Sequence, residues 1–149
     1  MVSAKEIWGS CAPLISLFFA LEAIWGKILT VDTLMKSGWS MANRCCLCKD
    51  SEESADHILI HCDKAKKLWT VLLTSFGPVW VFPNSMRNLL LQWKVKGLRK
   101  KIRAMWRLAL ICLFWCIWGE RNQKTFQEEE ISDQSLKKLF IHSLLEWSQ

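Results

Sequence analysis

The sequence predicts a mainly α-helical fold, and three observations lead to that prediction. Apolar residues recur at steps of three and four positions through most of the 149 residues. Six residues are Gly and three are Pro, so neither disorder nor low complexity is expected. There is no internal repeat and no strand-rich block. At this length the chain is expected to form one domain, or a small module with a helical extension.

The N-terminal third predicts two helices. Pro13 suits the first turn of a helix, which is expected to continue toward Leu29. The apolar positions expected to face inward are Leu14, Leu17, Phe18, Leu21, Trp25 and Leu29. Asp32 is expected to cap a short helix over Thr33–Ser37, which Gly38 would close.

A helix is predicted next after Asp63, which suits its N-cap, and Gly77-Pro78 would end it. Its apolar stripe is Ala65, Leu68, Trp69, Leu72, Leu73 and Phe76. A short extended segment is expected over residues 79–83, followed by a helix over residues 84–93.

The C-terminal part predicts one long helix and a final shorter one. The long helix, over Arg99–Gln127, is apolar nearly all round in its middle and should be the most buried element. Ser132 suits the N-cap of the final helix, with Ile131 and Leu136 placed as a hydrophobic staple. The inner face of that helix is expected to be Leu136, Leu139, Phe140, Leu144 and Trp147.

The seven cysteines are expected to be reduced, because no convincing secretory signal precedes them. The apolar run Ala12–Leu21 is followed at once by Glu22 and continues a helical pattern. The run Leu108–Trp118 is about half the roughly twenty residues that a membrane span needs. The expected location is therefore intracellular, nuclear or cytoplasmic with a preference for nuclear, not secreted, and with no membrane partner.

Residues 43–62 interrupt the helical pattern and contain four potential metal ligands. Cys45, Cys48, His57 and Cys62 have the spacing C-x2-C-x8-H-x4-C, which supplies the four ligands of a tetrahedral structural zinc site. One Zn2+ per chain is predicted, structural rather than catalytic because all four positions are filled by protein. Ser54 is expected to cap a short helix that carries His57. This helix must end before Cys62, because in an ideal α-helix two residues five positions apart lie about 140° apart round the axis and cannot face the same ion.

Two neighbouring residues rank lower as ligands. Cys46 stands in a C-x-C relation to Cys48, which is harder to close on one ion, and His61 adjoins Cys62. The alternative is that all of these are ordinary buried cysteines and a hydrogen-bonded histidine. The polar, loop-like character of the stretch favours zinc, and Arg44 and Lys49 beside it would offset the net negative charge of the site.

The charge is divided unevenly along the chain. The net charge is +6, yet residues 64–119 contain eleven Lys or Arg and no acid. A basic face of this kind favours RNA or single-stranded DNA as a partner. The expected phosphate contacts, with Trp93 as a stacking ring, are Lys64, Lys66, Lys67, Lys94, Lys96, Arg99, Lys100, Lys101, Arg103 and Trp93. A solvated helix surface and a nuclear-import signal are the alternatives.

The sequence predicts no enzyme and no small-molecule substrate. The five Asp are scattered and no Asp-Asp pair occurs, so the metal-binding carboxylate sets of a polymerase or a ribonuclease H are absent. No Gly-rich phosphate loop is present, and no Ser or Cys nucleophile has a base placed by a known motif.

The ligand stretch resembles a known family. The segments Arg44–Lys49 and Glu53–Leu59, then Cys62, Ala65 and Trp69, are similar to the zinc-binding domain that follows the polymerase in plant LINE-type (non-LTR) retrotransposon reverse transcriptases, the zf-RVT family. The similarity begins earlier, at Ile7-Trp8, Pro13, Phe18-Phe19 and Leu29-x-x-Asp-x-Leu34. Downstream, Cys116–Asn122 with Phe126 resembles the "IW.ERN" segment of the C-terminal extension in the same proteins.

The resemblance implies a zinc-stapled helical module over residues 1–76, with its ligands in 43–62, followed by a helical C-terminal extension over 77–149. It implies a non-catalytic tail that holds nucleic acid near a reverse transcriptase domain, present in cis or in trans. One alternative is a protein-interaction or packing domain with a purely structural zinc. Another is a non-functional remnant, because Pro13–Ser16 lacks the base that the family carries there.

Overall fold

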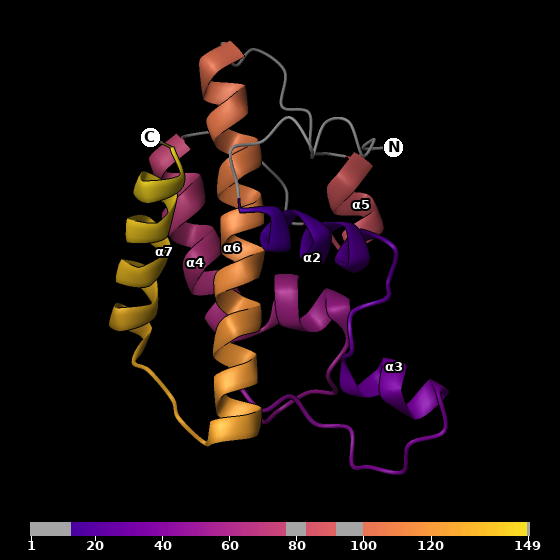
Figure 1. The fold of residues 1–149 in the computed structure, drawn as a ribbon. Coiled ribbons are helices and arrows are strands. Elements are labelled where there is room, and N and C mark those ends of the chain that lie inside the picture. The colour runs from indigo at the N-terminus through magenta and orange to yellow at the C-terminus, as the bar shows by residue number, and fades with distance from the viewer. Residues whose placement is uncertain (1–12, 77–82, 92–99, 149) are drawn as a thin grey trace.

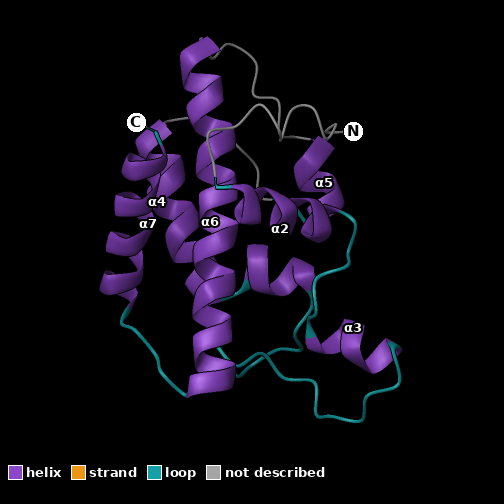
Figure 2. Cartoon of the chain, viewed as in Figure 1, coloured by secondary structure: helices purple, strands orange, loops and turns teal. Residues whose placement is uncertain are grey.

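The computed structural model describes residues 13–76, 83–91 and 100–148, and within these ranges it contains helices and loops but no strand (Figures 1 and 2). This confirms the mainly α fold. The described elements, in chain order, are α2 (Leu14–Ile24), α3 (Val31–Lys36), the π-helical turn η1 (His57–His61), α4 (Asp63–Phe76), α5 (Met86–Leu91), α6 (Lys100–Gln127) and α7 (Asp133–Trp147).

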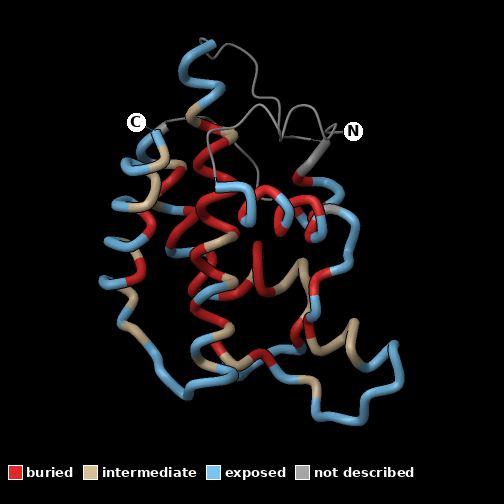
Figure 3. The backbone as a smooth tube through the Cα atoms, in the orientation of Figure 1, coloured by how far each residue is buried: buried red, intermediate tan, exposed pale blue. Residues whose placement is uncertain are grey.

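Helix α6 is the centre of the fold (Figure 1). It packs against α2, α4, η1 and α7, and its middle is buried almost without interruption from Trp106 to Ile117 (Figure 3). The expectation that this helix is the most buried element is therefore confirmed. Among the described helices, α6 alone is long and apolar enough to cross a membrane, a test that a core helix also passes. Here its apolar residues form the core of the fold.

Helix α2 lies across α6 with a different face inward from the one predicted. Leu17 and Leu21 are buried as expected, but Phe18 is half exposed and Trp25 is 63% exposed. Phe19 points inward instead and contacts both Trp115 and Trp118, with ring centroids 5.8 and 5.4 Å apart. Leu14 and Leu29 are also exposed. Because α2 is apolar all round, periodicity alone does not select its inner stripe.

The short helices begin close to where capping residues predicted. Helix α3 starts at Val31 with Thr30 as N-cap, so the prediction that Asp32 caps a helix beginning at Thr33 is wrong, and Asp32 lies in the first turn instead. Gly38 takes a φ of 100° that permits the turn after the helix. Ser85 caps α5, since its hydroxyl oxygen accepts a hydrogen bond from Asn88 N–H at 3.1 Å. The expected segment over 79–83 and the end of the predicted 84–93 helix lie largely outside the described residues.

Helix α4 buries four residues of its predicted stripe, Ala65, Leu68, Trp69 and Leu72, while Leu73 is partly buried and the side chain of Phe76 lies outside the described residues. Its start differs by one residue. The carbonyl of Cys62 accepts the hydrogen bond from Lys66 N–H at 2.9 Å, so Cys62 is the N-cap. Asp63 lies in the first turn, where its carboxylate favours the positive end of the helix.

Helix α7 is capped as predicted and buries a narrower face. Ser132 Oγ accepts a hydrogen bond from Ser135 N–H at 3.1 Å, and Leu136 is buried. Phe140 is also buried, but Leu139 is 45% exposed, so the prediction that Leu139 faces inward is wrong. Helix α7 packs against α4 and α6 on one side only, so it buries only a narrow stripe of apolar side chains.

Residues from the proposed 1–76 module and the proposed 77–149 extension contribute to one hydrophobic cluster. Leu17, Ile58 and Trp69 on one side meet Trp106, Phe114 and Phe140 on the other. For example, the rings of Trp69 and Phe114 lie 6.1 Å apart in an edge-to-face arrangement. The division of the chain at residue 76 stays a prediction.

The different burial of two neighbours on α7 gives a stability test. Phe140 is 1% exposed, so Phe140→Ala should lower the free energy of unfolding by about 3–5 kcal/mol, from lost burial and the cavity that remains. Leu139→Ala should change it by less than about 0.5 kcal/mol. Urea denaturation followed by circular dichroism measures both, and equal losses would contradict this placement of α7.

Candidate metal centre

The first two ligands lie in a tight loop whose backbone hydrogen bonds close it on itself. Cys45 N–H donates to Ser51 O at 2.7 Å, and Lys49 N–H donates to Cys45 O at 2.9 Å. Asp50 N–H donates to Cys48 Sγ at 3.5 Å. Lys49 has a φ of 62°, a left-handed conformation that turns the chain after the second cysteine. The loop therefore presents Cys45 and Cys48 toward the same point.

The other two ligands lie at the ends of a π-helical turn. Ser54 caps it as predicted, because its Oγ accepts from His57 N–H at 3.1 Å. Cys62 N–H donates to His57 O at 2.6 Å, a bond that spans five residues. An α-helical turn would leave positions 57 and 62 about 140° apart, whereas the wider π turn returns Cys62 to the side of His57. Cys62 then leaves helical geometry, with φ −61° and ψ 141°, as predicted.

The structure brings the four predicted ligand atoms within 4.8 Å of one another. Cys45 Sγ and Cys62 Sγ are 3.9 Å apart, and Cys48 Sγ lies 3.3 Å from His57 Nε2. A tetrahedral zinc ion with bonds of about 2.3 Å to sulfur and about 2.0 Å to nitrogen requires ligand separations of roughly 3.5–3.8 Å. Cys45 and Cys62 are fully buried and Cys48 and His57 partly so. The donor set and its spacing fit a structural zinc ion.

The thiols also influence one another's protonation. The hydrogen bond between Cys45 and Cys62, together with burial, raises the pKa of Cys45 to about 12. The same hydrogen bond lowers the pKa of Cys62 below its usual value. Hydrogen bonding to Cys45, and more weakly to Cys48, raises the pKa of His57. These hydrogen bonds therefore link the same side chains that a zinc ion would join.

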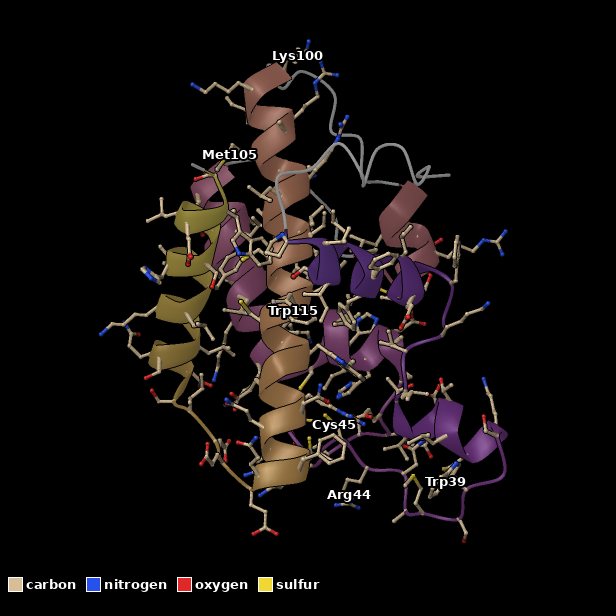
Figure 4. All side chains as sticks on the ribbon, viewed as in Figure 1. Trp39, Arg44, Cys45, Lys100, Met105 and Trp115 are labelled. Atoms are coloured by element: carbon tan, nitrogen blue, oxygen red, sulfur yellow. The ribbon has the colours of Figure 1, made fainter. Side chains whose placement is uncertain are left out.

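The two residues ranked lower as ligands point elsewhere. Cys46 Sγ lies 3.4 Å from Thr125 Oγ1 and 3.8 Å from Arg121 O, so this thiol contacts α6, and burial raises its pKa. His61 Nε2 lies 2.8 Å from Asn84 O, beside the start of α5. Arg44 donates to Lys49 O at 2.9 Å, which braces the loop. Figure 4 shows Cys45 beside the C-terminal end of α6.

Sequence reasoning missed Glu53 and Arg121. Both side chains are buried, and Arg121 Nη2 lies 2.7 Å from Glu53 Oε1. The pair joins the segment between the two ligand pairs to α6. Charged residues are rarely buried, so nothing in the local pattern at Glu53 distinguished it from a surface acid. The Glu-Arg-Asn run at residues 120–122 was the available signal, and it was read only as part of a resemblance.

The predicted nucleic-acid-binding residues fall into four groups: buried, exposed and paired, exposed and unpaired by an acid, and outside the described residues. Lys64 is a correction: it is buried, donates to Ile131 O at 2.9 Å and is surrounded by Glu120, Glu130 and Asp133, so its ammonium cannot reach a phosphate. Lys67 pairs with Asp133. Lys66, Lys100, Lys101 and Arg103 are exposed and have no ion pair with an acidic side chain of the described residues. Trp93, Lys94, Lys96 and Arg99 lie outside the described residues.

Comparison with known protein families gives a match that covers the four predicted ligands. Residues 1–69 match the zf-RVT family, zinc-binding in reverse transcriptase. The zf-RVT region includes all four ligands and ends in α4 at Trp69, whose indole N–H donates to Leu59 O at 2.9 Å in the turn that carries His57. No curated protein and no solved structure matches this chain.

The ligand assignment predicts opposite results for two neighbouring cysteines. Cys48→Ser should lose the zinc ion and lower the thermal stability, because metal binding at such a site is coupled to folding. Cys46→Ser should retain one zinc per chain, since its thiol points at α6. Elemental analysis of the purified variants measures the metal. Full zinc content in Cys48→Ser would contradict the assignment.

Zinc affinity should depend steeply on pH. The pKa of Cys45 is raised to about 12, so its thiol holds a proton at neutral pH, and this proton must leave before the metal–ligand bond forms. The raised pKa of His57 acts in the same direction, because a protonated imidazole cannot bind a metal ion. The apparent affinity should therefore rise with pH and fall on acidification, with protons released on binding. Titration with zinc between pH 6 and 8 against a competing chelator tests this. An affinity independent of pH would contradict it.

Proposed function

We propose that this chain is a non-catalytic, zinc-stabilised tail module that binds RNA or single-stranded DNA beside a reverse transcriptase. The observation that carries the proposal is the Cys3His cluster inside the zf-RVT region. One zinc ion per chain, bound by Cys45, Cys48, His57 and Cys62, would fill its coordination sphere with protein atoms. Such an ion has no open position for substrate or water, which supports a structural role.

The proposed nucleic-acid surface is the N-terminal end of α6. Residues 100–104 are all exposed, and this end of the helix extends beyond the packed core (Figure 3). It carries Lys100, Lys101 and Arg103, and no acidic side chain among the described residues pairs with them. Lys64 and Lys67, by contrast, are neutralised within the chain. The positive end of the α6 dipole adds to the attraction for phosphate.

The proposal extends to the origin of the chain. The "IW.ERN" run at residues 117–122 supports descent from the tail of a plant LINE-type (non-LTR) retrotransposon polyprotein, with residues 77–149 as its C-terminal extension. A reverse transcriptase domain, in cis or in trans, would then be the protein partner. We therefore also propose an intracellular location, with the nucleus favoured over the cytoplasm, because a module with this role must be where its nucleic acid is.

A protein-docking role is the second candidate, and one observation favours it. A groove of about 410 Å3 between α2, α3 and the C-terminal end of α6 is lined mainly by apolar side chains. Phe126, at its edge, is 74% exposed. Exposed apolar surface of this kind often marks a protein contact. On this reading zinc is purely structural and the groove holds part of a polymerase.

Salt dependence separates the two roles. If the end of α6 contacts phosphates, the affinity for labelled single-stranded RNA or DNA should fall with salt, with a log–log slope of about −0.7 per phosphate. Replacing Lys100, Lys101 and Arg103 by Gln should weaken binding to all sequences alike and flatten the slope. Fluorescence anisotropy at several salt concentrations measures both quantities.

The matched control removes the same charge elsewhere. Lys27→Gln, Lys36→Gln and Lys138→Gln change three exposed lysines on other elements and should leave more of the affinity intact. Equal loss in the two triple variants would mean that only net charge matters. No binding of the parent chain at about 0.15 M salt, where the Debye length is about 8 Å, would leave the docking role in its place.

A further inference from the structure

The segment between the two ligand pairs is attached to α6 by a buried, bidentate ion pair. Arg121 Nε donates to Glu53 Oε2 at 3.1 Å, and Arg121 Nη2 donates to Glu53 Oε1 at 2.7 Å. Glu53 is 1% exposed and Arg121 4% exposed. The planar guanidinium fits the carboxylate through two parallel bonds, which fixes direction as well as distance.

Two more hydrogen bonds and a ring contact hold the guanidinium of Arg121. Nη1 donates to Asn122 Oδ1 at 3.0 Å, and Nη2 also reaches Leu29 O at 3.3 Å. The guanidinium lies over the ring of Trp118, 4.6 Å from its centroid. Trp118 and Asn122 of α6 therefore hold the guanidinium in its orientation toward Glu53.

Glu53 is equally constrained on its own side. Its Oε1 accepts from Val31 N–H at 2.9 Å, and its backbone N–H donates to Asn43 Oδ1 at 2.8 Å. The next residue, Ser54, caps the turn that carries His57, and Ser51 closes the loop that carries Cys45. Fixing Glu53 therefore fixes the spacing between the Cys45–Cys48 loop and the His57–Cys62 turn.

We propose that Arg121 is a positioning residue of the metal centre: through Glu53 it aligns the two ligand pairs, so that α6, outside the zf-RVT region, sets how tightly zinc is held. The inference rests on the metal site and does not depend on nucleic-acid binding. Cys46 provides a second contact of the same kind, since its thiol lies against Arg121 O and Thr125 on α6.

The size of the effect follows from the burial of the pair. Removing one partner leaves the other charge buried and uncompensated, so the segment at Glu53 must move toward water. Outer residues that orient metal ligands typically change metal affinity by about 10–100-fold when mutated. Lysine keeps the charge but cannot form the bidentate contact, so it should restore only part of the affinity.

The test compares zinc affinity and release in full-length variants. Arg121→Met should weaken zinc binding by about 10–100-fold and speed zinc release to a chelator. Arg121→Lys should fall between Arg121→Met and the parent. Cobalt-substituted protein gives a second readout, because distortion of the tetrahedral site changes its visible absorption bands. Circular dichroism at the same temperature establishes that each variant is folded.

Glu120→Gln is the matched control. Glu120 is the neighbouring buried charge on α6, but its carboxylate is directed to Lys64 and Ile131 N–H rather than to the metal-binding loop. The Glu120→Gln substitution should lower the free energy of unfolding and leave the zinc affinity and the cobalt absorption bands unchanged. Equal loss of affinity in Glu120→Gln would reduce the effect to general destabilisation and overturn the inference.

A zinc affinity equal to that of the parent in Arg121→Met would also overturn the proposed role of Arg121. If Arg121→Met does not fold, Arg121→Lys carries the test, and parent-like affinity and cobalt bands in that variant give the same negative answer. A parent chain that binds no zinc would overturn the metal site itself. That result is distinct from a parent that binds zinc with an affinity insensitive to Arg121.

Discussion

The proposed zinc site places one geometric constraint on the chain: three sulfurs and one imidazole nitrogen must lie at the corners of a single tetrahedron. The chain satisfies it with a left-handed turn at Lys49 and a π-helical turn between His57 and Cys62. Cys62 is both a predicted ligand and the N-cap of α4, so the start of α4 adjoins the proposed metal site directly. The buried stripe of α4 then packs against α6 and α7.

Helix α6 connects this site to the rest of the chain. Its two adjacent buried charges point to different elements: Glu120 binds Lys64 of α4 and the backbone before α7, while Arg121 binds Glu53 of the ligand segment. Buried charges are expensive unless they are paired, so each of these contacts specifies one arrangement of the helices around α6. Arg121 therefore connects the proposed metal-binding segment to the helix around which the other helices pack.

Much of this could be predicted from the sequence, because the relevant signals are local. The spacing of cysteines and histidine, the cap at Ser132 and the apolar middle of α6 each depend on neighbouring residues alone. The inner face of α2 could not be predicted, since both of its faces are apolar and the Trp115–Trp118 surface selects Phe19. The burial of Lys64 and the Glu53–Arg121 pair join residues 56–68 positions apart, and a single sequence contains no trace of such pairing.

The most direct test of the account is X-ray absorption at the zinc edge of the purified, full-length protein. The predicted ligand set requires a four-coordinate ion with three sulfur neighbours at about 2.3 Å and one nitrogen neighbour at about 2.0 Å. A shell of oxygen and nitrogen atoms alone would contradict it, and so would a shell of four sulfurs, which would bring Cys46 into the site in place of His57.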